Sequence, residues 1–265
     1  MLKDFTLGQY YPVDSLLHRL DPRMKILLIF MYLLLIFIVK TFYGFLFAAG
    51  LTAFAIGISK VPFKNLFKSL RPVLVIISFT LVLHALFTKG GRVLLEVGFL
   101  TIESQGLYTG AFMTLRLVLL VITTTLLTLT TSPIALTDGI EYLLSPFKRI
   151  GVPAHELAMM MTISLRFIPM LILESEKIMK AQLARGADFS EGSLFQRARN
   201  LVPLIVPLFV SAFRRAEELA TAMEVRCYRG GEGRTRLKKL ELSRKDIYAA
   251  AVLFLACLIV IASSI

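Results

Sequence analysis

The sequence predicts an all-α polytopic membrane protein with about five transmembrane helices and a cytoplasmic coupling domain of long crossed helices. Of its 265 residues, 56% are hydrophobic and only 18% are charged, which is too apolar for a soluble domain. Apolar runs of roughly 20 residues, the length that crosses a bilayer, recur along the chain. The Lys and Arg residues gather in alternate connecting segments, which is the positive-inside pattern of membrane proteins.

The distribution of basic residues predicts the orientation of the chain. Its formal charge of +12 arises from 30 Lys and Arg against 18 Asp and Glu. Most basic residues lie in residues 1–25, 60–71 and 132–245, and in the last region acidic residues alternate with them. Only Lys40, Lys89 and Arg92 fall in the other loops. This bias predicts a cytoplasmic amino terminus, and the mixed charges argue against a nucleic-acid partner.

We expect a membrane domain over residues 1–131 with four spans, followed by a final transmembrane helix over residues 246–265. The four expected spans are Met24–Val39, Phe42–Ser59, Arg71–Phe87 and Gly106–Thr131. Asp21 is a typical N-cap, and Pro22 fits the first helical position. The first run covers only about 24 Å at the helical rise, which is short for a bilayer.

Two connecting segments have patterns of their own. Residues 60–69 place Lys64 and Lys68 on one side and phenylalanines on the other, which predicts an amphipathic linker on the inner side. Residues 88–105 are rich in β-branched residues around Gly98, which predicts either a short hairpin or a re-entrant piece.

Arg116 is a charged residue inside the fourth apolar run. An ionisable residue within a span is by default a candidate functional residue, here for a conduction path with the neighbouring threonines. The alternative is structural: Arg116 lies about three turns from the outer end, where it can snorkel or bond threonine hydroxyls. The threonines themselves favour close helix packing.

Residues 132–245 are the expected cytoplasmic coupling helices. A first helix is expected over Ile134–Ile150, with Pro146 breaking its end. Ala154–Arg185 and Ser193–Tyr228 then predict two helices of roughly 47 Å or more. Charged residues recur along both, so no window of about 20 residues is free of charge, which argues against simple spans. Such helices lie along a membrane face or bind partners.

Methionines and prolines recur on these two long helices. Six methionines lie there, including Met159 and Met160. Methionine surfaces suit changing partners, and the same residues would equally fill a crossing between the helices. Pro169, Pro203 and Pro207 each remove a backbone hydrogen bond, which predicts bends that let the helices cross, or breaks within them.

The two long helices end in similar phrases, Ala184-Arg185-Gly186 and Val225-Arg226-Cys227. Gly186 is typical of a left-handed helix stop. An arginine at such a tip can bond a partner's carboxylate bidentately, or merely complement its own helix dipole, worth about 0.3–1 kcal/mol. Two such ends, 41 residues apart, favour paired docking tips for a partner of two related subunits.

The sequence offers no sign of catalysis. Residues 230–235 lack the spacing and the lysine of a phosphate-binding loop. No His and Cys residues have metal-ligand spacing, and no nucleophile and base are paired. We therefore expect a non-catalytic chain with no catalytic, cofactor-binding or metal-binding residues. If ATP is used, another chain hydrolyses it.

Four phrases resemble the transmembrane (T) component of energy-coupling factor (ECF) transporters, prokaryotic machines for vitamin and metal uptake. They are HRLDPRMK (18–25), LRFIP (165–169), AQLARG (181–186) and RAEELATAMEVRCY (215–228). They follow one another over nearly the whole chain. The second tip departs from the family's small-residue pattern at Val225 and Cys227, but keeps its arginine.

The resemblance implies a multi-pass protein of the prokaryotic cell membrane with two kinds of partner. Ala184-Arg185-Gly186 and Val225-Arg226-Cys227 would dock on two ATP-binding-cassette (ABC) ATPase subunits. The crossed apolar helices would contact the substrate-binding membrane (S) component. The residues expected to face it are Met159, Met160, Leu204 and Leu208.

Two other classes of function remain open from the residues alone. A self-contained secondary transporter or channel would use Arg116 and the threonines as its pathway, although the single intramembrane charge and the lack of inverted repeats argue against it. A membrane scaffold with a purely interaction role would recruit no ATPase.

Overall fold

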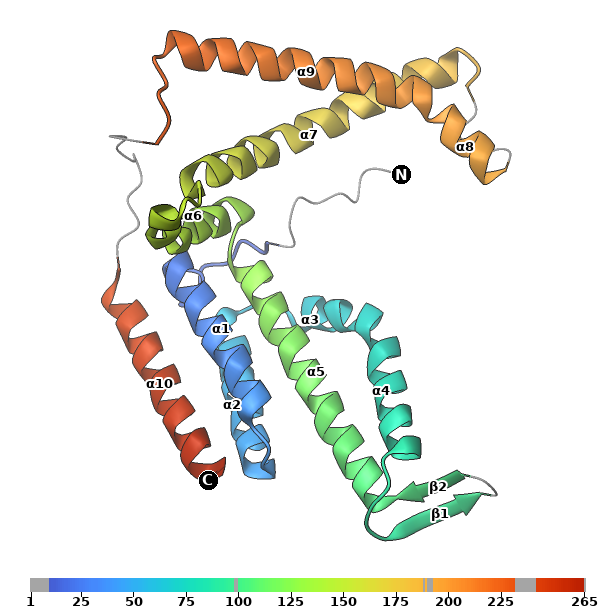
Figure 1. Ribbon diagram of the computed structural model, residues 1–265, viewed down its shortest axis with the longest axis vertical. Helices are drawn as coiled ribbons and strands as arrows, with labels where there is room; N and C mark the ends of the chain where they lie inside the picture. The colour runs from blue at the N-terminus through green and yellow to red at the C-terminus, as the bar shows by residue number, and fades with distance from the viewer. Residues whose placement is uncertain (1–9, 98–99, 188, 190–192, 232–241, 265) are drawn as a thin grey trace. The chain divides into compact units, whose positions relative to one another are not determined.

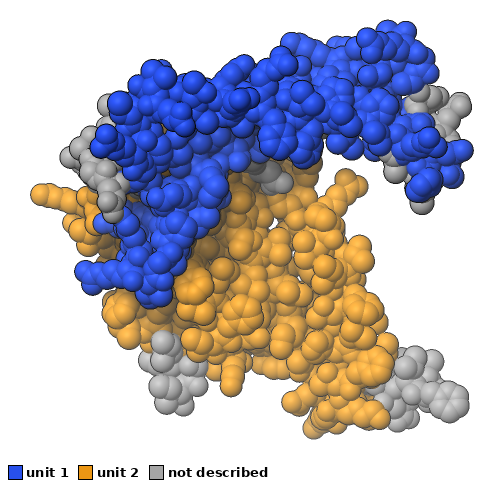
Figure 2. All heavy atoms as spheres, turned by 45° about the horizontal axis from the view of Figure 1, so that its top comes forward, with its two compact units in different colours: residues 1–7, 140–239 blue, residues 8–139, 240–265 orange. Residues whose placement is uncertain are grey.

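The computed structural model describes residues 10–97, 100–187, 189, 193–231 and 242–264. The chain divides into two compact units, coloured separately in Figure 2. Residues 8–139 and 240–265 form one, here the bundle unit, and residues 1–7 and 140–239 form the other, here the arm unit. The expectation of a turn around Gly98 concerns a residue outside the described ranges.

The bundle unit contains a helix at each of the five predicted spans (Figure 1). These helices are α1 (Pro22–Ile38), α2 (Phe42–Ser59), α4 (Leu74–Phe87), α5 (Ser104–Thr130) and α10 (Arg244–Ser264). α5 packs against α1, α2 and α4. The largest buried cluster joins α1, α2, α5 and α10, and includes Ile36, Phe45, Leu119 and Val260. The predicted all-α membrane fold is confirmed in this unit.

Among the described residues, four helical stretches are long and apolar enough to cross a membrane by length and composition: Phe42–Ser59, Phe63–Phe87, Ser104–Thr130 and Ala154–Ala184. Three of these are predicted spans. The fourth is the first long helix of the arm unit. Its charged residues were expected to distinguish it from the membrane spans, but its length and composition are those of a span. α1 has only 17 residues, in keeping with the shortness expected of it.

Asp246 joins the start of α10 to the start of α1. Its carboxylate accepts the backbone N–H of Asp21 at 2.8 Å and that of Ser243 at 2.7 Å, and the residue is fully buried. The second bond is half of a capping box, because Ser243 precedes α10 and Asp246 is its third residue. Asp21 in turn caps α1 by accepting from the N–H of Arg23 at 2.9 Å, as predicted.

Arg116 is a structural residue at the tip of the α1–α2 hairpin. Its Nη2 donates to the carbonyl oxygen of Val39 at 2.9 Å, and its guanidinium lies 5.5 Å from the centre of the Phe45 ring. Val39 is the C-cap of α1, where carbonyl groups lack helical partners. Arg116 therefore ties α5 to the α1–α2 hairpin, which supports the structural interpretation over a conduction path.

The two connecting segments adopt their predicted forms. The outer segment contains two antiparallel paired strands, β1 (Val93–Val97) and β2 (Leu100–Glu103), as in the predicted hairpin rather than in a re-entrant piece. The amphipathic linker is α3 (Phe63–Leu70), followed by a 3-10 turn, η1 (Arg71–Val73), that leads into α4. At the hairpin's end of the unit, Gly106 allows a close approach, since a Cβ there would lie 2.7 Å from the carbonyl oxygen of His84.

The arm unit is built on two long helices, with shorter helices at their starts. α6 (Pro133–Leu144) leads into it, and the 3-10 helix η2 (Ser145–Ile150) follows, beginning beside Pro146 as predicted. α7 (Ala154–Ala184) is a single helix with Pro169 inside it. The prediction of one helix over Ser193–Tyr228 is wrong: α8 (Leu194–Asn200) and α9 (Val202–Val225) are separate.

The break before α9 has a local cause. Pro203 stands in the first turn of α9, where its missing N–H costs nothing, whereas inside a longer helix it would remove a hydrogen bond and clash with the preceding turn. The pattern of apolar residues continues through this point. For this reason the periodicity of the sequence predicted a single helix where the structure has two.

Candidate docking site on the arm unit

α7 and α9 cross in antiparallel directions (Figure 1). Near the end of α7, Gln182 Nε2 donates to the carbonyl oxygen of Pro203 at 3.4 Å. Further along α9, Arg215 Nη2 lies 3.8 Å from an oxygen of Glu174. A contact that lies later in α9 lies earlier in α7, as expected of two antiparallel helices. The crossing therefore fixes where the end of each helix lies relative to the other helix.

The end of α7 is a Schellman motif centred on Gly186. The N–H of Ala187 donates to Gln182 O and the N–H of Gly186 donates to Leu183 O, both at 3.0 Å. Gly186 has a φ of 86°, the left-handed conformation that glycine adopts without penalty. Arg185 is the C-cap and is exposed. The predicted left-handed stop is confirmed.

The end of α9 repeats this motif residue for residue. The N–H of Tyr228 donates to Met223 O at 3.0 Å and the N–H of Cys227 donates to Glu224 O at 2.8 Å. Arg226 is the C-cap and is exposed. Cys227 takes the place of Gly186, with a φ of 56°. The chain therefore presents two arginines in the same backbone setting.

Cys227 departs from the small-residue pattern of the family, and the sequence did not predict that it would adopt the left-handed conformation. A left-handed conformation costs an L-residue other than Gly, Asn or Asp roughly 1–2 kcal/mol. The end of α9 keeps the motif despite that cost, because the two Schellman hydrogen bonds and the packing around Tyr228 hold the turn. The equivalence of the two tips is thus a property of the backbone that the residue types at 225 and 227 conceal.

The two arginine tips lie about one helix length apart. Arg185 follows Gln182, which contacts the first turn of α9, and Arg226 closes the other end of that helix. α9 has 24 residues, which is about 36 Å at the helical rise. A single helix therefore separates the tips.

His155 holds the chain that leaves the second tip. Its Nδ1 lies 2.9 Å from Glu141 Oε1, and the hydroxyl of Tyr228 lies 3.5 Å from its Nε2. A Cβ on Gly231 would lie 2.6 Å from the His155 ring, so the backbone passes directly over the imidazole. His155 thus positions the second tip against the first turn of α7. Sequence reasoning gave this histidine no role, because its partners are distant in the chain.

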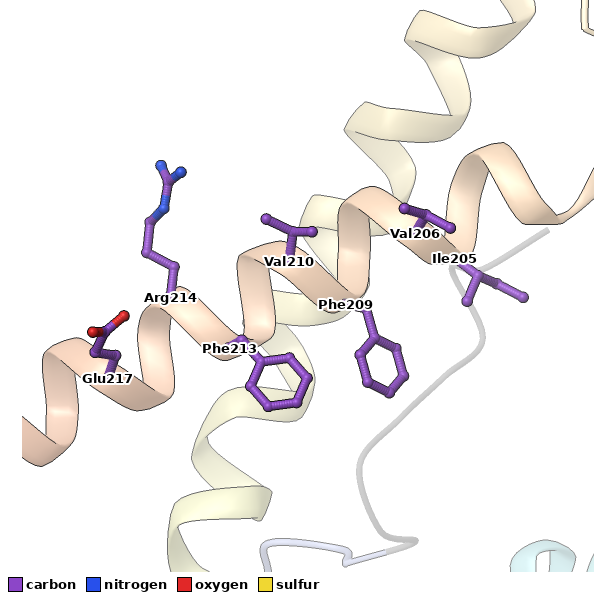
Figure 3. Close-up of a pocket in the computed structure, with 7 residues that line it drawn as sticks. All are labelled: Ile205, Val206, Phe209, Val210, Phe213, Arg214 and Glu217. Carbon is purple, nitrogen blue, oxygen red and sulfur yellow. The ribbon is translucent and has the colours of Figure 1, made fainter.

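α9 carries an exposed apolar face beside the crossing. Five side chains form it, with exposed fractions between 49% and 67%: Ile205, Val206, Phe209, Val210 and Phe213. They line a shallow open hollow with Arg214 and Glu217. Figure 3 shows Phe209 and Phe213 pointing to one side of the helix and Arg214 to the other. Large apolar surface of this kind marks an interaction site.

The four residues expected to face an S component do not share one setting. Leu204 and Leu208 are half-buried on α9, and Met159 is half-buried on α7. Met160 is 54% exposed. The exposed face of α9 lies one residue further along than the predicted leucines. Its periodicity from Ile205 to Phe213 is a signal that could have identified it from the sequence.

Comparison with known proteins identifies the family of this chain. Residues 14–237 match the family CbiQ, described as cobalt transport protein. The chain belongs to the CbiQ family. The match includes both arginine tips and the whole of α9. It therefore covers the helices that position the site and not only the apolar bundle.

Relatives with curated names resemble this chain over nearly its full length. The energy-coupling factor transporter transmembrane protein EcfT of Clostridium kluyveri is 56% identical over 260 residues, 97% of this chain and 96% of the relative. That of Thermosediminibacter oceani is 57% identical over 248 residues, 94% and 93%. That of Bacillus subtilis is 48% identical over 261 residues, 96% and 98%.

The family places this chain among transport components of the membrane rather than among catalysts. Within the part of the chain that the structure describes, no group of three His, Cys, Asp or Glu side chains is placed to hold a metal ion. The chemistry available at the tips is hydrogen bonding from two exposed guanidinium groups. The site is therefore suited to docking.

Proposed function

We propose that the chain is the transmembrane coupling subunit of an ATP-driven ECF-type vitamin or metal uptake transporter, and that it links two ABC-type ATPase subunits to a substrate-binding S component. The observation that carries the proposal is the pair of Schellman tips, each with an exposed C-cap arginine. Two equivalent tips suit a partner of two related subunits. The partners hydrolyse ATP, and this chain transmits the resulting movement.

Each tip is suited to an acidic groove on an ATPase. The guanidinium group donates in a planar fork that matches a carboxylate. Ala184 and Gly186 flank Arg185 with little side-chain bulk, so the backbone can approach a partner closely. At the second tip, Val225 is 78% exposed and adds an apolar contact. Charge reversal at Arg185 and Arg226 tests this docking directly.

The proposed mechanism uses the rigidity of α9. When the two ATPase subunits close on ATP, they displace both tips. Because a helix does not shorten, the crossed pair, which is held together by the contacts of Gln182 and Arg215, tilts as a unit. An S component resting on the pair would then change its orientation in the membrane between outward-facing and inward-facing states.

The S component is proposed to contact the exposed apolar face of α9. Leu204 and Leu208 are half-buried and so offer less surface than their exposed neighbours, although Met160 on α7 remains available. Phe209 and Phe213 project side by side, with ring centres 5.5 Å apart. Two aromatic anchors of this kind are typical of the residues that dominate binding energy at an interface.

We expect the double substitution Phe209→Ser and Phe213→Ser to reduce the amount of S component that co-purifies with the complex by about 10- to 100-fold, since loss of such anchors costs about 2 kcal/mol or more. The ATPases should remain bound, because the tips are unchanged. The matched control is Phe195→Ser on α8, a side chain that is 81% exposed but lies off this face. Undiminished S component with the double variant would rule this face out.

Several observations favour a cytoplasmic amino terminus in a prokaryotic cell membrane for this multi-pass chain. Basic residues concentrate in residues 1–25, 60–71 and 132–245, which satisfies the positive-inside rule in one orientation only. In that orientation the arginine tips lie in the cytoplasm, where ATP is available. The alternative of a self-contained channel loses its main support, because Arg116 is bonded to Val39.

A further inference from the structure

α3 and its flanks carry an exposed surface that the coupling function does not explain. A basic stripe runs along it, formed by Lys60, Lys64, Lys68 and Arg71. All four residues are exposed. Lys64, Lys68 and Arg71 are three or four residues apart, which places them along one side of the helix, and Lys60 precedes the helix as the C-cap of α2. The sequence contains no acidic residue between Asp21 and Glu96, so the segment supplies no carboxylate of its own to neutralise the stripe.

Asp14 is a carboxylate near the basic stripe, and it is already engaged. It accepts hydrogen bonds from Arg19 Nε at 2.8 Å and Arg19 Nη2 at 2.6 Å. These bonds are the main cause that lowers the pKa of Asp14, and the charge of Lys60 is a weaker one. Asp14 therefore neutralises little of the positive charge of the basic stripe, and this charge is available to another partner.

α3 also has two apolar sides, and only one of them is covered. Leu66 is 4% exposed and packs with Val61 and Leu129 in a buried cluster. Phe63 and Phe67 are 66% and 69% exposed, although they are among the largest apolar side chains. They are four residues apart and so lie on one face, between the buried leucine and the basic stripe.

This order of faces matches a helix at the boundary of the apolar layer of a bilayer. The buried leucine attaches α3 to the bundle unit, the phenylalanines would enter the acyl region, and the lysine stems would extend toward the headgroups. α3 is itself the beginning of a stretch, Phe63–Phe87, that is long and apolar enough to cross a membrane. Its own position is therefore at the end of a span.

We propose that α3 and the basic stripe bind anionic phospholipid, with Phe63 and Phe67 among the acyl chains and the four cations on the phosphate groups. The favourable electrostatic attraction of each cation to an anionic surface adds to the burial of the two rings. This binding would hold the start of α4 at the membrane surface independently of the arm unit. It would also weaken as salt screens the charges.

The test uses the absence of tryptophan from the chain. Phe67→Trp introduces a single indole on the lipid-facing side of α3. The full chain carrying it is reconstituted in vesicles of phosphatidylcholine and phosphatidylglycerol in equal parts, with bromine label on one lipid or the other. We expect quenching of the indole to be about two- to fivefold stronger when the label is on phosphatidylglycerol, and this preference to fall as sodium chloride is raised.

Three neutral substitutions in the same background, Lys64→Gln, Lys68→Gln and Arg71→Gln combined, should equalise the quenching by the two lipids. Lys40→Gln, at an exposed lysine of the α1–α2 turn, should leave the preference intact. Equal quenching by both lipids before any charge is removed, or a preference that salt does not change, would overturn the proposal. If the triple variant fails to incorporate, the salt titration of the Phe67→Trp chain decides.

Discussion

The combined substitution Arg185→Glu and Arg226→Glu is expected to abolish uptake and to release the ATPases from the complex. Each glutamate would place a negative charge where a guanidinium is expected to meet a carboxylate. Loss of one partner of a hydrogen-bonded charge pair costs about 2–5 kcal/mol, so each single reversal should weaken ATPase association about 30-fold or more. The measurement is the amount of ATPase that co-purifies with the chain, together with ATP-dependent uptake.

The control for this pair is Lys177→Glu, which reverses an exposed charge on α7 away from either tip. It should leave ATPase association within about twofold of the parent, because an isolated surface charge contributes little. Full ATPase association and full uptake by the double variant would show that the arginines merely complement their own helix dipoles. A loss with Arg185→Glu but none with Arg226→Glu would indicate that the two tips are not equivalent.

The largest effect on stability is expected for Asp246→Ala. Its buried carboxylate holds the N–H of Asp21 and the N–H of Ser243, and removal leaves both donors of α1 and α10 without this acceptor. Hydrogen bonds to a charged group contribute about 1.5–3 kcal/mol each, so a loss of about 3–6 kcal/mol is expected. Thermal unfolding of the reconstituted chain should show a midpoint lower by about 10 °C.

Two companion variants make this result specific. Asp246→Asn keeps one acceptor oxygen in place and should recover about half of the lost stability. Arg244→Ala, at an exposed neighbour, should change the midpoint little. If Asp246→Ala unfolded at the same temperature as the parent, the carboxylate would not be what joins α10 to α1.

Much of this fold could be predicted from the sequence by rules that act within a few residues. The Asp21 cap, the stop at Gly186 and the interruption at Pro146 follow from side-chain chemistry within a few residues of each element. The spans follow from apolar length. The pairing of the two tips was also predictable in outline, because the arginines stand at matching positions before each helix end.

The remainder depends on contacts between residues far apart in the chain. Asp246 meets Asp21 across more than two hundred residues, and Arg116 meets Val39 on a different helix. His155 meets Tyr228 only because α7 and α9 run antiparallel. The turn at Cys227 contradicts the usual preference of its residue type, so propensity concealed the second motif. The prolines predicted either a bend or a break, and the apolar periodicity that runs through Leu201 did not decide between them.

Crosslinking from the two tips tests the central claim most directly. In a background of Cys227→Ser and Cys257→Ser, single cysteines are introduced by Ala184→Cys, by Val225→Cys or, as a control, by Leu173→Cys at a side chain of α7 that is 60% exposed. With a short bifunctional reagent on the assembled complex, both tip variants should crosslink to an ATPase subunit and the control should not. Absence of ATPase crosslinks at both tips, or equal crosslinking from position 173, would contradict the docking of two ATPases by the paired arginine tips.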